Sequence, residues 1–463
     1  MSLSSALHIA SSGLTVASLQ TEVASRNIAS ANTPGFTRKN AETVTAATGE
    51  VRVGSVERSV DALLVRLERS GRSRLAAATT RADGIAAYAA HLGQPEDGYS
   101  PAATVEKLRT ALVTLSAFPS QDAAQLRVIS SAKDVTRNLS SLDASLKTVT
   151  REVDMNLRYD VASANEVMQQ LAALNRTATS PMEAVAKSQL ADRVSGLVDR
   201  LSEYMDIQTV TTTAGIISVY TSAGTELVVD DQTFDLAFDA ATGRLSAGDV
   251  DLTPGATRRG LSGGSLAGLI DLRSTVLPQF GDQLDGLAAA LIDGFQTANP
   301  MPDGRGLFTD AGAAYSPLQQ KGLAARIAVN ETLDPDLGGD PGGLQSGGTA
   351  GVPTGDSSRI DAMLSAFLQP VTVATGGLGT GLTLGALAPA VVGGQQAVRA
   401  DAEAASETSR AASETVASAR SNFEGVNIDD EMQKLLLVQR SYAANAKVLS
   451  AVTTMLDALL SAV

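Results

Sequence analysis

The residues that could do chemistry are few and far apart in this 463-residue chain, which has two histidines, His8 and His91, and no cysteine. Neither histidine has a neighbour at the spacing of metal ligands, and no Ser–His–Asp arrangement can be argued from them. Without cysteine there is no disulfide, thiolate metal site or thiol nucleophile. We expect His8 on a helix beside its apolar side and His91 in a loop, both as ordinary solvated or half-buried side chains.

Two other patterns resemble ligand sites only superficially. The glycine-rich run 376–381 lacks the spacing of a dinucleotide loop and the Lys-Ser/Thr that follows a phosphate loop, so we expect a flexible loop. The aspartates Asp230, Asp231, Asp235 and Asp239 do not match a calcium loop and should cap and solubilise strand ends. No pair of carboxylates stands out as acid and base. The sequence therefore predicts no catalytic residue, no cofactor and no metal site, and we expect that the protein is not an enzyme.

The composition of the chain indicates which classes of partner and which locations are disfavoured. The net charge is −14 and the pI about 4.7, and an acidic surface repels nucleic acid and anionic lipid, so we expect neither as a main partner. The longest uncharged stretch, 362–398, is interrupted by Pro370 and Pro389, which disfavours a membrane-spanning helix. Residues 1–21 contain no Lys or Arg, so the positive start of a secretory signal is missing. We expect a soluble protein that stays inside the cell or leaves it by an unconventional route.

The elements that position the chain's functional residues are mainly helices, and the strongest patterns lie at its two ends. Apolar or small residues recur there at alternating spacings of four and three, which is typical of helices that pack along a seam. The N-terminal seam consists of Leu3, Leu7, Ala10, Leu14, Ala17, Thr21, Ala24 and Ile28. The C-terminal seam consists of Ile428, Met432, Leu435, Gln439, Tyr442, Ala446, Leu449, Thr453, Leu456, Leu460 and Val463. The helices should be roughly 40 and 55 Å long, and the alanine-rich first one should be stable mainly within a multi-subunit bundle.

A turn ends the first helix near Ser30. Pro34 excludes the helical conformation for Thr33 and has no N–H to donate, and a Pro-Gly pair at the centre of Thr33–Phe36 is the signature of a type II turn. Gly35 should therefore have a positive φ, and the Asn32 side chain can bond the backbone of the turn. Beyond the turn, the chain should be extended through Val51-Arg52-Val53 to Val56.

The second terminal helix should begin at Asn427. This asparagine has the character of an N-cap, and the acidic residues that follow it, Asp429, Asp430 and Glu431, suit the positive end of a helix dipole.

The middle of the chain is predicted to be mostly helical. A long helix should cover about 121–176, and a capping box at Ser180–Glu183, with proline as the first helical residue, should begin a partner helix that continues to Tyr204. The strands of a β insertion should be Ile216–Tyr220, Leu227–Val229 and Phe234–Phe238. Residues 262–298 should be helical, 334–355 a loop, and helices should dominate from about 395. The expected domains are a terminal helix at 1–31, a helical body at 32–207, a β-rich insertion at 208–261, a second helical part with glycine-rich loops at 262–424, and a terminal helix at 425–463.

The end segments resemble the flagellar axial proteins of bacteria, which are the rod, hook and hook-associated proteins. The resemblance is carried by the turn Asn32-Thr33-Pro34-Gly35-Phe36 and by "GVNIDDEMQKLLLVQRSYAANAKVLSAVTTMLDALL" from residue 425 onward. Phe36-Thr37-Arg38, the helix pair 121–205 and "LSGGSLAGLIDLR" at 261–273 are similar to the hook-associated members that join hook to filament. The similarity extends over most of the chain.

The resemblance implies a mainly α, elongated multidomain axial protein with a small β insertion, a discontinuous helical body, and terminal helices paired as a coiled-coil domain. It implies a structural subunit that is exported through the flagellar type III channel without a cleaved signal peptide and polymerises outside the cell at the hook–filament junction. The implied partners are further copies in a ring or helical layer, the hook protein, a second junction protein and an export chaperone. The expected assembly interface consists of Leu3, Leu7, Leu14, Ile28, Asn32, Pro34, Gly35, Phe36, Asn427, Ile428, Met432, Leu435, Tyr442, Asn445, Leu449, Leu456 and Leu460.

Two alternatives remain at this stage. A hook or distal-rod protein of the same family would share both end segments, but a hook protein should have large β domains in its middle, and here the middle is chiefly helical. A flagellum-associated enzyme, such as a wall hydrolase, belongs to a different class. An assay on peptidoglycan separates that class from a structural subunit.

Overall fold

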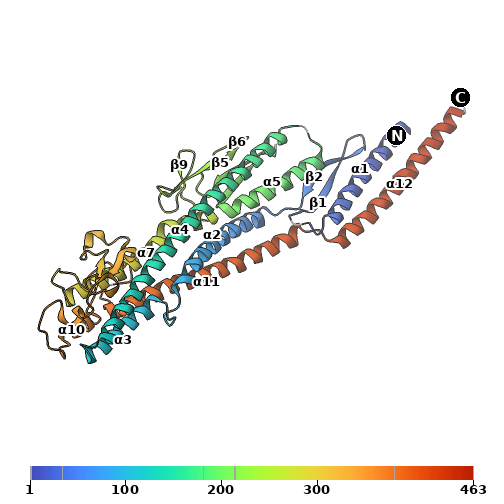
Figure 1. Cartoon of the computed structure of the whole chain (residues 1–463). Coiled ribbons are helices and arrows are strands. Elements are labelled where there is room, and N and C mark those ends of the chain that lie inside the picture. Colours follow the sequence, from blue (N-terminus) through green and yellow to red (C-terminus); the bar gives the residue numbers. More distant parts are fainter. Residues whose placement is uncertain (1–2, 34, 181, 213–214, 380, 462–463) are drawn as a thin grey trace.

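The computed structural model shows an elongated, mainly helical molecule with both chain ends at the same end (Figure 1). It describes residues 3–33, 35–180, 182–212, 215–379 and 381–461. The α-helices are α1 (Leu3–Ala29), α2 (Ala62–Leu92), α3 (Pro101–Ala117), α4 (Asp122–Ala178), α5 (Ala184–Tyr204), α6 (Ser265–Asp271), α7 (Leu277–Ala298), α8 (Leu323–Arg326), α9 (Gly343–Ser346), α10 (Ser358–Ala366), α11 (Leu384–Glu424) and α12 (Ile428–Ser461). A π-helical segment, η1 (Leu272–Val276), joins α6 to α7, and η2 (Pro317–Gln319) and η3 (Pro335–Leu337) are 3-10 turns.

Small antiparallel sheets accompany the helices. Their strands are β1 (Lys39–Thr45), β2 (Val51–Arg58), β3 (Ile207–Thr211), β4 (Ile217–Thr221), β5 (Glu226–Val229), β6 (Gln232–Thr233), β7 (Leu236–Asp239), β8 (Arg244–Ala247), β9 (Val250–Asp251), β10 (Phe308–Asp310) and β11 (Ile327–Val329). The sheets are β1-β2, β3-β4-β5-β6, β7-β8-β9 and β10-β11. Among the described residues no helix is long and apolar enough to cross a bilayer.

The 57-residue helix α4 is the backbone of the body. At 1.5 Å per residue it is roughly 85 Å long. An apolar seam is buried along its length, at Leu139, Leu142, Leu146, Val149 and Val153. It packs against α2, α3, α5, α6 and α7. Helix α11 runs beside α2 toward the neck, which is the segment 35–61 between α1 and α2 that contains the β1-β2 hairpin (Figure 1). The long helices therefore form one continuous core that carries the terminal pair at its end.

The β insertion is attached to α4 by two asparagines. Asn165 accepts a hydrogen bond from the Leu236 N–H (2.7 Å) and donates one to the Leu236 carbonyl (2.9 Å). Asn175 accepts from the Ile217 N–H (3.0 Å) and donates to the Ile217 carbonyl (2.8 Å). The predicted strand Phe234–Phe238 begins too early, because Phe234 and Asp235 lie between β6 and β7, and β7 starts only at Leu236, where Asn165 of α4 holds the backbone.

Three boundary predictions were also wrong. Helix α5 begins at Ala184, and Glu183 is its N-cap without a side-chain bond, because the Ser180 N–H still bonds the Thr177 carbonyl at the end of α4 (3.2 Å). Pro181 lies outside the described residues. His91 is an exposed residue in the last turn of α2, which ends only where Gly93 takes a φ of 74°. Helix α11 begins at Leu384, earlier than predicted, because the Thr383 hydroxyl caps it.

Candidate assembly interface: the terminal helix pair and its neck

The two terminal helices pack side by side, as the family resemblance implies (Figure 1). The small seam residues of α1, Ala10, Ala17 and Ala24, are buried, while its leucines are only half-buried. The helices lie close together at Gly13, where a Cβ atom would lie 2.6 Å from the Asn445 side-chain nitrogen. The alanines and glycine of α1 thus bring the helices close together but cover little apolar surface.

The side of α12 that faces α1 differs from the predicted seam at alternate positions. Glu431 and Val452 are buried, and Asn445 lies against Gly13, whereas Met432 is 49% exposed. The line of residues on α12 that faces α1, the inner line, therefore contains Glu431, Asn445 and Val452. Each of them is one residue before a member of the predicted seam. Leu435, Leu449 and Leu456 are common to both lines and are half-buried. The inner line differs from the predicted seam for a physical reason. The surface of α1 accommodates small and polar side chains of α12 and leaves the bulky ones outside the contact.

Asn27 is at the centre of a buried cluster of polar side chains, near the end of α1 and the beginning of α12. Its amide donates to the Lys39 carbonyl (2.8 Å) and to Glu431 Oε2 (3.0 Å), and its oxygen accepts from the Lys39 N–H (3.1 Å). Lys434 donates to the other Glu431 oxygen (2.9 Å) and to Asn40 (3.2 Å). Asn27 has no exposed surface and Glu431 is 1% exposed. The cluster joins α1, β1 and α12, and the Asn27 amide and both Glu431 oxygens are hydrogen-bonded in it.

The turn after α1 has the predicted character. The Phe36 N–H donates to the Thr33 carbonyl (3.2 Å), and Gly35 has a φ of 76°. Pro34 lies outside the described residues. Asn32 is exposed and makes no side-chain hydrogen bond to another described residue, so the predicted bond to the turn is not observed.

Beyond the turn, Lys39 fastens the neck to the body. Its ammonium lies 4.3 Å from the centre of the Phe36 ring and pairs with Asp192 of α5. Arg58 at the end of β2 pairs with the same aspartate (2.7 Å). The β1-β2 hairpin is therefore held against α5 by two cations that share one partly buried carboxylate.

A buried group of charges lies where α11 ends. Arg420 donates to Glu68 of α2 (2.9 Å) and to Asp199 of α5 (3.0 Å), and also to Glu424 one turn later (2.9 Å). Burial alone would lower the pKa of Arg420, but Asp199 and Glu424 outweigh it and raise that pKa. Burial also raises the pKa of the Glu424 carboxyl. Because the Glu424 carbonyl accepts from the Arg38 N–H (2.9 Å), this group links the neck to three helices of the body.

The outer faces of α12 carry unpaired apolar side chains. In the single chain the large residues that are about half exposed or more are Ile428, Met432, Leu436, Leu437, Tyr442, Val448, Met455, Leu459 and Leu460. Apolar side chains gathered on one helix in this way are typical of a surface that a partner covers. Asn427 caps the helix as predicted, since its oxygen accepts from the Asp429 N–H (3.0 Å).

The predicted interface residues that the structure describes lie together at one end of the molecule, some of them between the two terminal helices and others on the outer faces of the pair. Sequence reasoning missed Asn27, Glu431, Gly13 and Arg420. A signal existed for Asn27, which is a polar residue directly before the seam position Ile28. Glu431 was interpreted only through the helix dipole.

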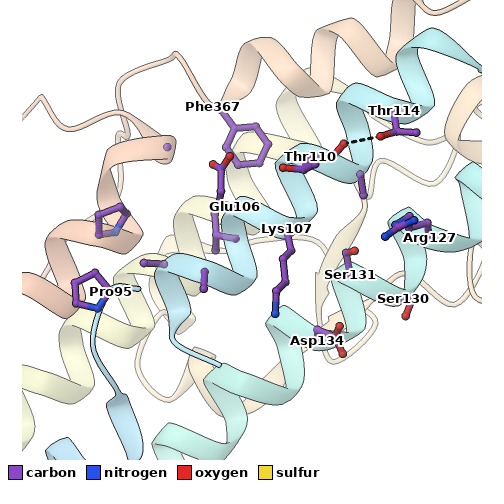
Figure 2. A pocket seen from close by; sticks show the side chains of 16 residues that line it. Pro95, Glu106, Lys107, Thr110, Thr114, Arg127, Ser130, Ser131, Asp134 and Phe367 are labelled. Atoms are coloured by element: carbon purple, nitrogen blue, oxygen red, sulfur yellow. Dashed lines mark hydrogen bonds between the residues drawn. The ribbon is translucent and has the colours of Figure 1, made fainter. Parts of the chain in front are cut away.

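A hollow at the opposite end of the molecule is a second candidate site, and its side chains do not favour catalysis. Figure 2 shows Thr110, Ser130 and Ser131 around a space of about 950 Å³ between α3 and α4. Three of the charged residues that line it are bonded elsewhere: Lys107 donates to the Gly98 carbonyl (2.6 Å), Glu106 binds Arg109, and Asp134 pairs with Arg137. The Arg109 hydrogen bond lowers the pKa of Glu106, so that carboxyl is a poor general acid.

Comparison with known families gives two matches. The helical domain of the flagellar hook-associated protein FlgK matches residues 92–301, from the end of α2 to just beyond α7. The C-terminal region of flagellar basal body rod proteins FlgEFG matches residues 418–462, which contain α12. The two matches together cover more than half of the chain.

Individual relatives agree with these matches. The chain is 26% identical to flagellar hook-associated protein 1 of Escherichia coli over 318 residues, which are 64% of this chain and 57% of that protein. It is 26% identical to the Salmonella typhimurium protein of that name, over 63% of this chain and 56% of the other. The chain thus spans little more than half the length of these relatives. The flagellar hook junction protein FlgK of Burkholderia pseudomallei is a structural neighbour at 23% identity, with a TM-score of 0.45, over 53% of this chain and 47% of the other.

Proposed function

Because the chain belongs to the family of flagellar rod and hook-associated proteins, we propose that it is a structural subunit of the bacterial flagellum that polymerises between hook and filament. The observation that carries the proposal is the match of the FlgK helical domain to 92–301, the segment that forms the body from α3 to α7. A rod-type C-terminal helix alone would fit any axial protein of the family.

The terminal pair supplies the physical basis for polymerisation. Helix α12 buries only Glu431 and Val452 in the single chain and exposes most of its large apolar residues. Each such side chain is already about half buried, so a neighbour that covers the rest contributes roughly half the value for full burial, about 0.7–1.5 kcal/mol. A layer of subunits whose terminal pairs line the inside of the tube would cover them, and the neck would connect that inner layer to the outer body.

The proposed partners follow from that position. Copies of this chain form the layer, the hook protein lies below it and a second junction protein above it. An export chaperone would cover the apolar faces of α12 before secretion through the flagellar channel. The mature protein would then be extracellular, at the hook–filament junction.

Deleting the gene tests the proposal. We expect hooks without filaments and filament protein in the medium, with filaments restored by a plasmid copy. Cells that lack hooks as well would support the alternative of a hook or distal-rod protein. Normal filaments on the deletion strain would overturn both structural assignments. Digestion of peptidoglycan by the purified protein would favour the enzyme alternative instead.

A further inference from the structure

A groove beside the neck is not used by the terminal pair. It lies between α2, α5 and β3 and has a volume of about 860 Å³. Its floor is apolar, with Val65, Leu190 and Val194 mostly buried there, and Leu67 on its edge is 41% exposed. Its one carboxylate, Asp206, is already bonded to Ser222 and Ser262, so the groove presents mainly apolar surface.

The rim of the groove is basic, although the chain as a whole carries a net charge of −14. Arg66 on α2 and Lys187 on α5 line it, and neither makes an ion pair with another described residue. Two free cations beside an apolar floor suit an amphipathic segment with acidic residues at one end.

The first turns of α12 have that composition. Asp429 and Asp430 are exposed at the beginning of the helix, and two exposed apolar residues, Met432 and Leu436, follow. The exposed fractions of these two side chains are 49% and 54%. Helices α2 and α5, which form two sides of the groove, lie next to the β1-β2 hairpin, and α12 begins near the same hairpin (Figure 1). Two copies standing side by side could therefore bring them together.

We propose that the first turns of α12 in one copy dock into the groove between α2, α5 and β3 of the next copy. Asp429 and Asp430 then face Arg66 and Lys187, and the apolar side chains of α12 cover the groove floor. The contact is head-to-tail, because each copy offers two different surfaces, and such a contact generates a ring or a helical layer. The proposal rests on the proposed function and names the surface through which the layer forms.

The absence of cysteine makes a cross-linking test clean, since every disulfide must come from introduced residues. Purified full-length Leu67→Cys and Leu436→Cys are mixed at high concentration and oxidised mildly. We expect a disulfide heterodimer, and a ladder of covalent multimers from the double variant. The matched control replaces Leu126, an exposed leucine in the first turn of α4 at the opposite end, and Leu126→Cys with Leu436→Cys should cross-link at least tenfold more slowly. Equal rates for the two pairs would overturn the proposal.

Charge reversal provides an independent arm. Arg66→Glu in the groove chain should slow the cross-link about tenfold at low salt, and Asp429→Lys in the helix chain should restore it. If reversal has no effect, or the compensating change does not rescue it, the docking geometry is wrong. The same variants are then localised on isolated hooks. Chain present at hook tips without the 67–436 cross-link refutes this contact while the proposed function stands, and chain absent from hook tips refutes the function.

Discussion

Replacing Asn27 by alanine should release the terminal helix pair without unfolding the body. The substitution removes three hydrogen bonds, one to the Glu431 carboxylate and two to the backbone of Lys39. A charge-assisted bond contributes about 1.5–3 kcal/mol and a neutral one about 0.5–1.5 kcal/mol, so the expected loss is about 3 kcal/mol. Lys434 still pairs with Glu431, which limits the penalty on that carboxylate.

Amide hydrogen exchange measures this loss locally. When reclosing is fast, the exchange rate follows the opening equilibrium, and each 1.4 kcal/mol corresponds to a factor of about ten. The amides of α1 and of the first turns of α12 should therefore exchange roughly a hundredfold faster in Asn27→Ala. The amides of α4, whose apolar seam is buried in the body, should be unchanged.

Asn32→Ala is the matched control. It is the same substitution a few residues along the chain, at an exposed side chain that bonds no other described residue. It should leave exchange in both helices at the parent rate. The reasoning is refuted if Asn27→Ala leaves the protection of α12 intact. It is also refuted if α4 loses protection to the same extent, because the effect would then be global.

Three further expectations concern the turn, the inner line of α12 and the buried charges. Gly35→Val should strain the turn by roughly 1–3 kcal/mol, since φ is 76° and no neighbour lies within 4 Å of the added Cβ; we expect a folded body but reduced incorporation, measured by motility and by protein on hooks. Leu449→Asp, at a half-buried position, should block filament growth when purified protein is added to filamentless hooks, whereas exposed Lys447→Asp should be much milder. Burial raises the pKa of Glu424 in the folded chain, so the native state binds a proton more readily than the unfolded chain. This group's contribution to stability is therefore lost as the pH rises from about 4.5 through the raised pKa. A plot of melting temperature against pH should accordingly fall less across that window for Glu424→Gln than for the parent.

Much of the helical architecture was predictable because its signals are local. The end of α1, the cap at Asn427 and the buried seam of α4 depend on residues within one or two turns of each other. The positive φ of Gly35 follows from the Pro-Gly pair alone. Where local signals competed, prediction failed. Ser180 has a capping-box pattern, yet its N–H continues the end of α4.

The sequence by itself determined that helices with long seams stand at both ends of the chain, that a turn separates the first from the body, and that no cysteine chemistry is possible. Only the tertiary structure decided which face of α12 meets α1. Two overlapping lines of residues fit the same four-and-three spacing, and the choice between Glu431 and Met432 depends on Asn27, 404 residues away in the chain. The grouping of Arg420 with Glu68 and Asp199 is likewise beyond any periodic pattern, because burial of a charge is stable only once its partners have been brought from other helices. Spacing along the chain fixes which residues share a helix, and packing fixes which of them meet.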